Sequence, residues 1–113
     1  KSLFGNGAMI EGWAVYTELM MLENGYKATP EMWLMYYKWN LRSTCNTIID
    51  VGIHTKNWSE KQVIDLLTRE AFQQTAEAEG KWKRATLSQV QLCSYYTGFS
   101  DIVDLRAAYR KKM

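Results

Sequence analysis

Two carboxylates interrupt an apolar stretch near the start of the chain, which runs from Met9 to Leu22. At about 100° per residue, Glu11, Val15 and Glu18 fall on one stripe of a helix. A carboxylate on such a stripe must be paired, hydrogen-bonded or bound to a cation, because burying a bare charge is costly. Glu11 is therefore a candidate metal ligand. The alternatives are a solvated helix edge or a structural acid paired with one of the 14 Lys and Arg residues.

Four polar residues recur every four positions further along the chain: Arg42, Asn46, Asp50 and His54. On a helix each step turns by about 40°, so the set drifts slowly around one side. Asp50 and His54 can meet if the helix extends that far, and a carboxylate that accepts from one imidazole nitrogen selects the tautomer and raises basicity. The alternative is an ordinary i,i+4 pair near a helix C-terminus, which favours His.

Tyr95, Tyr96 and Arg106 are candidates in the last part of the chain. A Tyr hydroxyl can stabilise a developing oxyanion, although Tyr is also the commonest aromatic residue here, with seven copies, and packs readily in cores. The planar guanidinium of Arg106 can clamp a substrate carboxylate. It can equally pair with Asp101 or Asp104.

Helix signals dominate the first half of the sequence. The first helix is expected from about Ala8 to Asn24, with Gly25 as a left-handed stop. Thr29 and Pro30 have the residue types of an N-cap and a first helical position, and they open a long second helix. This helix is expected to run to about Val51 or Gly52.

Further helices are expected in the second half. Ser59 and Gln62 form a capping box, which opens a helix to about Arg69, and Trp58 is placed to staple onto Val63. Three more helices are expected over about 75–85, 87–96 and 100–109, with Gly98 ending the second of these. No alternation of period two is long enough for a strand. The fold class is all-α, a bundle of five or six helices.

The bulk composition limits the classes of function. The chain has 113 residues, of which 47% are hydrophobic, so it is one domain or part of one, with ample core material. A formal charge of +2 argues against a nucleic-acid partner. No apolar run of about 18 residues exists, so no membrane span is expected. Cys45 and Cys93 can form one bridge or remain two buried thiols.

Four segments in order resemble the bacterial domain-of-unknown-function family 885. The first runs from Phe4 to Glu18 around Glu11-Gly12-Trp13-Ala14. The others are Asp50-Val51-Gly52-Ile53-His54-Thr55 with Trp58-Ser59, Gln91-Leu92-Cys93-Ser94-Tyr95-Tyr96-Thr97-Gly98, and Leu105-Arg106.

Members of that family resemble gluzincin-type zinc metallopeptidases. In those enzymes a helix with H-E-x-x-H supplies two His ligands and a catalytic Glu, and a later helix supplies a Glu as third ligand. The resemblance implies that Glu11 is this third ligand and that Glu18 is a second acid behind it or facing the substrate. It implies contacts with substrate or transition state for His54, Tyr95 and Arg106, and supporting roles for Asp50 and Arg42.

The chain departs from that pattern because it has one histidine, His54, so H-E-x-x-H is absent. A catalytic zinc needs about three protein ligands. Residues 1–113 are therefore expected to be a single helical module, the C-terminal part of a larger zincin-like fold or a degenerate relative. No activity and no bound zinc are expected for the chain alone, while zinc and a peptide substrate are expected in a bacterial parent.

Two kinds of partner follow from this interpretation. The rest of the parent polypeptide is expected to cover an apolar face of the chain, and the same face can support a homo-oligomer. The compartment stays open, and an exported, periplasmic or lipoprotein-anchored parent is compatible with the sequence.

Overall fold

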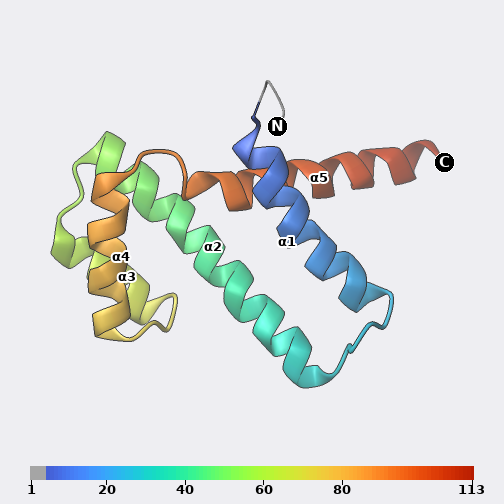
Figure 1. Ribbon diagram of the computed structural model, residues 1–113, viewed down its shortest axis with the longest axis horizontal. Helices are drawn as coiled ribbons and strands as arrows, with labels where there is room; N and C mark the ends of the chain where they lie inside the picture. Colours follow the sequence, from blue (N-terminus) through green and yellow to red (C-terminus); the bar gives the residue numbers. More distant parts are fainter. Residues whose placement is uncertain (1–4) are drawn as a thin grey trace. The chain divides into compact units, whose positions relative to one another are not determined.

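The computed structural model describes residues 5–113 and contains five α-helices there (Figure 1). They are α1 (Gly7–Glu23), α2 (Pro30–Lys56), α3 (Glu60–Arg69), α4 (Thr75–Leu87) and α5 (Cys93–Lys112). Residues 5–113 include no strand, so the predicted all-α class is confirmed. In the same residues no helix combines the length and the apolar character that crossing a membrane requires. Phe4, the first residue of the matching segments, lies outside the described residues.

The chain divides into two compact units. Unit 1 takes the described residues up to Asn40 together with Ser94–Met113, and unit 2 is Leu41–Cys93. Helix α2 therefore contributes its N-terminal part to unit 1 and the remainder to unit 2. The prediction that residues 1–113 are a single module of a larger domain stays a prediction.

In unit 1, α1 and α5 pack backbone against backbone at two glycines. A Cβ on Gly12 would overlap the backbone of Gly98, and a Cβ on Gly98 would overlap the carbonyl of Ala8. Both glycines are buried. Since any larger residue would push the helices apart, each glycine is required by this close approach.

The ends of the first two helices follow local signals. The Gly25 N–H donates to Leu22 O and the Tyr26 N–H to Met21 O, with Gly25 in the left-handed region at φ +83°. This is the pattern that a C-terminal glycine allows. At the start of α2, the hydroxyl of Thr29 accepts from the N–H of Met32 at 3.3 Å. Both predictions are confirmed.

Unit 2 has a closed hydrophobic core. Its fully buried members come from α2, α3 and α4 and the segments that follow them: Cys45, Ile49, Val63, Leu67, Ala71, Ala78, Ala85 and Leu92. Ser59 and Gln62 form the predicted capping box at the start of α3. The buried alanines at i and i+7 of α4 let this helix lie close to α3, since a small side chain shortens the distance between helix axes.

Helix α2 ends later than predicted, at Lys56 rather than Val51 or Gly52. Gly52 is buried within the helix because the ring of Trp58 packs where its Cβ would be. The Trp58 N–H donates to Gly52 O at 3.0 Å, and Asn57 takes the left-handed turn at φ 52°. Gly52 therefore does not end the helix, as the sequence suggested, but makes room for the ring of Trp58.

The predicted division into two helices over 87–96 and 100–109 is wrong, although residues 93–96 and 100–109 are helical. Residues 88–92 are not helical, and Val90 has a φ of 68°. A single helix, α5, then runs from Cys93 through Gly98 to Lys112. Gly98 serves the crossing with α1 rather than ending a helix.

Candidate functional site

The residues predicted to carry chemistry belong to both units. Unit 1 holds Glu11, Glu18, Tyr95 and Arg106, whereas Arg42, Asp50 and His54 lie in unit 2.

Glu11 projects from α1 at the crossing with α5, one residue before Gly12. Its side chain is half-buried. Within residues 5–113 it forms no ion pair and no side-chain hydrogen bond, so the predicted alternative of a structural ion pair is not found there. Within the same part of the chain, no three His, Cys, Asp or Glu side chains gather closely enough to hold a metal. A zinc site that included Glu11 would need its other ligands from elsewhere.

Tyr95 lies on α5 one turn before Gly98 and is half-buried. Since Gly98 contacts α1 at Gly12 and Ala8, the crossing that positions Glu11 also positions the backbone of Tyr95. The two family segments around Gly12 and Gly98 thus meet in unit 1, as parts of one helix–helix contact.

Arg106 is engaged by an acid that the sequence did not point to. Its guanidinium donates to the carboxylate of Glu23 on α1 at 2.7 Å, and it lies 5.8 Å from the ring centre of Tyr16. The hydrogen bond with Glu23 raises the pKa of Arg106. The predicted pairing with Asp101 or Asp104 is therefore wrong, because α1 brings Glu23 to the guanidinium instead.

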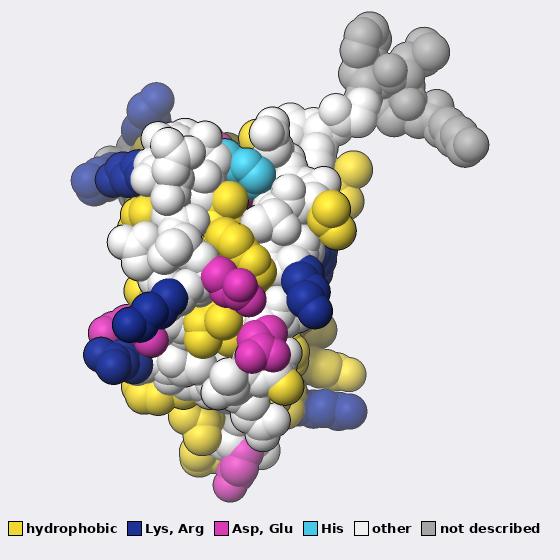
Figure 2. All heavy atoms as spheres, turned by 90° about the vertical axis from the view of Figure 1, so that its left-hand side faces the viewer, with side chains coloured by type: hydrophobic (Ala, Val, Ile, Leu, Met, Phe, Trp, Pro, Cys, Tyr) yellow, Lys and Arg dark blue, Asp and Glu magenta, His cyan; other side chains and the backbone are white. Residues whose placement is uncertain are grey.

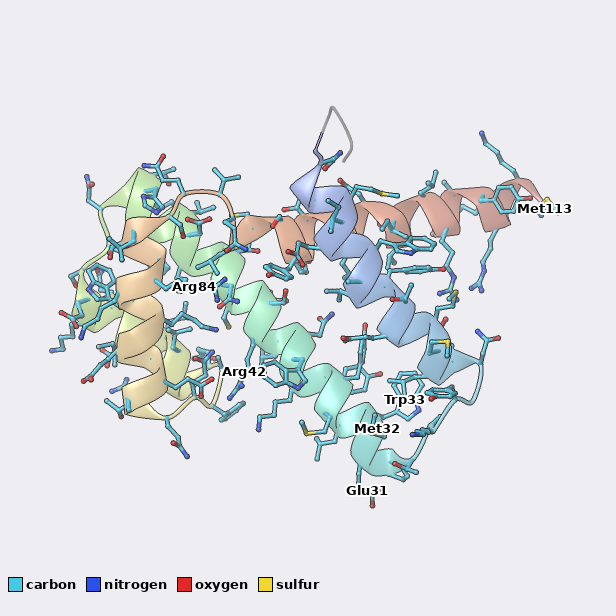
Figure 3. The ribbon with its side chains drawn as sticks, in the orientation of Figure 1. Glu31, Met32, Trp33, Arg42, Arg84 and Met113 are labelled. Atoms are coloured by element: carbon cyan, nitrogen blue, oxygen red, sulfur yellow. The ribbon has the colours of Figure 1, made fainter. Side chains whose placement is uncertain are left out.

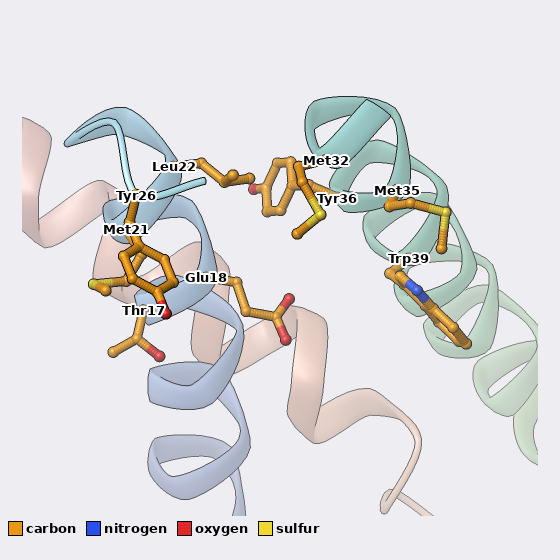
Figure 4. Close-up of a pocket in the computed structure, with 9 residues that line it drawn as sticks. All are labelled: Thr17, Glu18, Met21, Leu22, Tyr26, Met32, Met35, Tyr36 and Trp39. Atoms are coloured by element: carbon orange, nitrogen blue, oxygen red, sulfur yellow. The ribbon is translucent and has the colours of Figure 1, made fainter. Parts of the chain in front are cut away.

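Glu18 lies on a groove between α1 and the first part of α2 (Figure 4). The groove has a volume of about 500 Å³, and Glu18 is its one acidic lining residue. The other lining residues are mostly apolar or aromatic: Thr17, Met21, Leu22, Tyr26, Met32, Met35, Tyr36 and Trp39. Burial raises the pKa of Tyr36, and neighbouring Tyr37 and the charge of Glu18 raise it further.

In unit 2, the predicted contact between Asp50 and His54 is present. Nε2 of His54 lies 3.3 Å from Oδ1 of Asp50. The same nitrogen is closer to two backbone carbonyl oxygens, that of Ala85 at 2.9 Å and that of Ser88 at 3.1 Å. These carbonyls end α4 and lack partners within the helix, so His54 caps that helix. His54 therefore has a structural role as the cap of α4, whether or not it also has a chemical role.

Asp50 has a second partner, which sequence reasoning missed. The thiol of Cys93 donates to Oδ2 of Asp50 at 3.1 Å, and Asp50 is only 2% exposed. Burial and this hydrogen bond raise the pKa of Cys93 to about 11, so the thiol stays protonated near neutral pH. Both cysteines are free thiols. Since 43 positions separate Cys93 from Asp50, no spacing signal could have linked them.

Two basic residues of unit 2 support the packing of α4 (Figure 3). Arg42 forms an ion pair with Glu77 at 3.1 Å, and Arg84 donates to the side chain of Gln91 at 3.0 Å. On the face of the molecule shown in Figure 2, basic and acidic side chains are interspersed among hydrophobic ones, and the histidine in cyan reaches the surface. No single sign of charge dominates that face.

A family model described as "Bacterial protein of unknown function (DUF885)" matches residues 1–113. A solved structure of a proposed lipoprotein of unknown function from Shewanella oneidensis is 69% identical, with a TM-score of 0.90. The match covers 98% of this chain and 20% of that one, so the chain spans about a fifth of the solved relative. No curated protein matches the sequence.

Proposed function

The chain belongs to the DUF885 family of bacterial proteins of unknown function, and on that premise we propose that it is the C-terminal helical part of a zinc-dependent peptidase-like protein. In this proposal the chain is inactive alone and supplies the third metal ligand and substrate contacts to a longer polypeptide. The length of the solved relative, of which the chain covers 20%, is compatible with this role. The same relative leads us to propose an exported, lipid-anchored parent.

One observation carries the proposal: Glu11 is a half-buried carboxylate without a cationic partner in residues 5–113. A carboxylate in that position gains free energy when a cation balances its charge. Carboxylate oxygen is an accepted zinc ligand, and Glu11 would be one of the three protein ligands that a catalytic site needs. When bound, zinc would act as a Lewis acid toward a peptide carbonyl.

The other proposed roles belong to side chains that would contact the substrate. The Tyr95 hydroxyl would donate to the negative charge that develops on the carbonyl oxygen of the substrate. His54 would make a substrate contact with the nitrogen that does not cap α4. Glu18 would face a polar group of a peptide whose apolar part lies along the groove. Arg106 would reach a substrate carboxylate only by leaving Glu23.

The test is the zinc content of the longer polypeptide, purified without added metal and measured by mass spectrometry. Glu11→Gln keeps the size of the side chain but removes its charge, and we expect it to lose most of the bound zinc. Glu18→Gln, on the same helix, is the matched control and should keep the metal. Equal zinc in wild type and Glu11→Gln would refute the ligand role.

The exposed apolar surface of unit 1 favours a second candidate function, a non-catalytic interaction module. Leu34 is 69% exposed and Trp39 is 54% exposed, and Trp39 also lines the groove. Large apolar patches on a soluble chain commonly mark contact surfaces. The isolated chain should then self-associate in sedimentation experiments as its concentration rises, and Leu34→Ser should weaken this. A monodisperse monomer at the highest attainable concentration would contradict the idea.

A further inference from the structure

We propose that Nδ1 is the reactive nitrogen of His54, and that Cys93 is a positioning residue that acts on the imidazole through Asp50. The role of Nδ1 toward substrate rests on the proposed function. The arrangement of the imidazole does not, because it follows from contacts within unit 2.

The surroundings of Nε2 decide which nitrogen carries the proton. Two carbonyl oxygens lie within 3.1 Å of Nε2, and a carboxylate oxygen lies 3.3 Å away. A backbone carbonyl accepts hydrogen bonds and never donates one. Nε2 must therefore be the N–H nitrogen, and in the neutral ring Nδ1 keeps the lone pair.

Asp50 adds negative charge beside this N–H without completing a hydrogen bond. Its Oδ1 has no hydrogen-bond partner of acceptable geometry in the described part of the chain, although Nε2 is 3.3 Å away. The single proton on Nε2 is directed to the closer carbonyls. The carboxylate therefore favours the Nε2–H tautomer through its charge rather than as a direct acceptor.

Cys93 determines which way that carboxylate faces. Its thiol donates to Oδ2 at 3.1 Å, and it stays protonated near neutral pH because its pKa is raised to about 11. This bond leaves Oδ1 directed toward the imidazole. The thiol is a hydrogen-bond donor here, since a nucleophile would need the thiolate form.

The two ring nitrogens of His54 therefore have different roles. Nε2 is occupied by the end of α4 and is unavailable to a metal or a substrate. Nδ1 can accept a proton from a substrate or, once protonated, donate to developing negative charge. The histidine side chain is 20% exposed, which leaves part of the ring accessible.

The experiment is nitrogen NMR of the ¹⁵N-labelled 113-residue chain, in which the single histidine makes the imidazole signals unambiguous. Followed to the alkaline limit of the titration, the spectrum should show a proton on Nε2 and the chemical shift of a bare nitrogen at Nδ1. A proton on Nδ1, or rapid averaging of the two tautomers, would overturn the assignment.

The role of Cys93 is tested with two residues of nearly equal size. Cys93→Ala removes the donor, and we expect the Nε2–H proton to exchange with water about tenfold faster. Cys93→Ser keeps a hydroxyl donor and should stay within about threefold of wild type. Cys45→Ala, in the core, is the control and should leave this exchange unchanged. Equal behaviour of the Ala and Ser variants would show that only packing matters and would refute the positioning role.

The two proposals fail separately. A longer polypeptide that loses zinc in Glu11→Gln but carries the proton on Nδ1 of His54 would overturn the tautomer assignment alone. If the imidazole carries its proton on Nε2 but Glu11→Gln binds as much zinc as wild type, only the ligand role is overturned. Should Cys93→Ala fail to fold, the wild-type spectrum still decides the tautomer assignment, and an exchange more than about threefold faster in Cys93→Ser than in wild type would refute the positioning role.

Discussion

The two units of the chain achieve order in different ways. Unit 2 buries a continuous set of aliphatic side chains, among which Ile49, Val63 and Leu67 are 0% exposed. In unit 1 the buried hydrophobic residues among those described are Leu22 and Tyr36, and its helices meet instead through backbone contact at Gly12 and Gly98. A core stabilises by the apolar area removed from water, whereas a glycine crossing depends on one close fit.

This difference also separates the two kinds of candidate chemistry. Unit 2 brings its candidate polar residues into contact with one another, with Asp50 held by Cys93 and His54 on the end of α4, although Oδ1 of Asp50 has no hydrogen-bond partner among the described residues. Unit 1 keeps Glu11 without a partner in residues 5–113 and exposes large apolar side chains around the groove. The unpaired carboxylate and the exposed apolar side chains are the reason why we propose that unit 1 contacts further protein, metal or ligand.

The largest effect is expected from breaking the crossing in unit 1. Gly98→Ala places a methyl group against the carbonyl of Ala8 and should cost about 3 kcal/mol or more of unfolding free energy. Gly80→Ala is the control, because open space surrounds that position in α4, and it should stabilise by about 0.5–1 kcal/mol. Urea denaturation measures both. A tolerated Gly98→Ala would show that α1 and α5 do not meet as described.

A pair of histidine variants separates structure from chemistry in unit 2. His54→Gln can keep an amide donor near the position of Nε2 and so cap α4, whereas His54→Asn is too short to reach those carbonyls. We expect His54→Asn to destabilise the chain by about 1–3 kcal/mol and His54→Gln by clearly less. Thermal unfolding of the two variants gives the comparison.

The catalytic activity of His54→Gln tests whether His54 also has a chemical role. Under the proposed function, the longer polypeptide with His54→Gln should lose peptide hydrolysis although it remains folded, because it lacks Nδ1. Full activity in His54→Gln would reduce His54 to a helix cap.

A pH dependence sharpens the description of Cys93. The pKa of its thiol is raised from about 9 to about 11 in the folded chain. The folded state therefore holds the proton more tightly, so the associated stability is present below about pH 9 and is lost as the pH rises toward 11. After allowance for partial exposure, the loss should be on the order of 1 kcal/mol. Cys93→Ala should unfold with a flatter alkaline profile than wild type, and identical profiles would contradict the assignment.

The smallest effect is expected for the ion pair of unit 1. Arg106→Met removes the bond to Glu23 but retains much of the aliphatic packing, and it should cost about 0.5 kcal/mol because the pair is partly exposed. The loss should shrink further in high salt. Denaturation at low and high ionic strength checks this, and a salt-independent loss would indicate packing rather than charge.

The elements that sequence reasoning placed correctly depend on neighbours a few positions away. Thr29 and Pro30 begin α2, Ser59 and Gln62 begin α3, and Gly25 ends α1, all through bonds within one helical turn. The contact of Asp50 with His54 was predictable for the same reason, since four residues make about one turn.

The misplaced elements depend on partners far along the chain. Glycine commonly ends helices, but Gly52 and Gly98 lie within them. Gly52 makes room for the Trp58 ring, and Gly98 makes room for the backbone of Ala8. Arg106 pairs with Glu23 and not with Asp101 or Asp104, which are nearer in the sequence. The packing of α5 on α1 determines which acid lies beside the guanidinium.

The amino-acid sequence alone determined the helical class, most helix starts and the residue types from which a metal-linked function is proposed, because capping, periodicity and composition act locally. Only the tertiary structure decided that Gly12 meets Gly98, that Cys93 reaches Asp50, and that the end of α4 occupies Nε2 of His54. Those contacts join residues tens of positions apart, and their geometry depends on how whole helices pack.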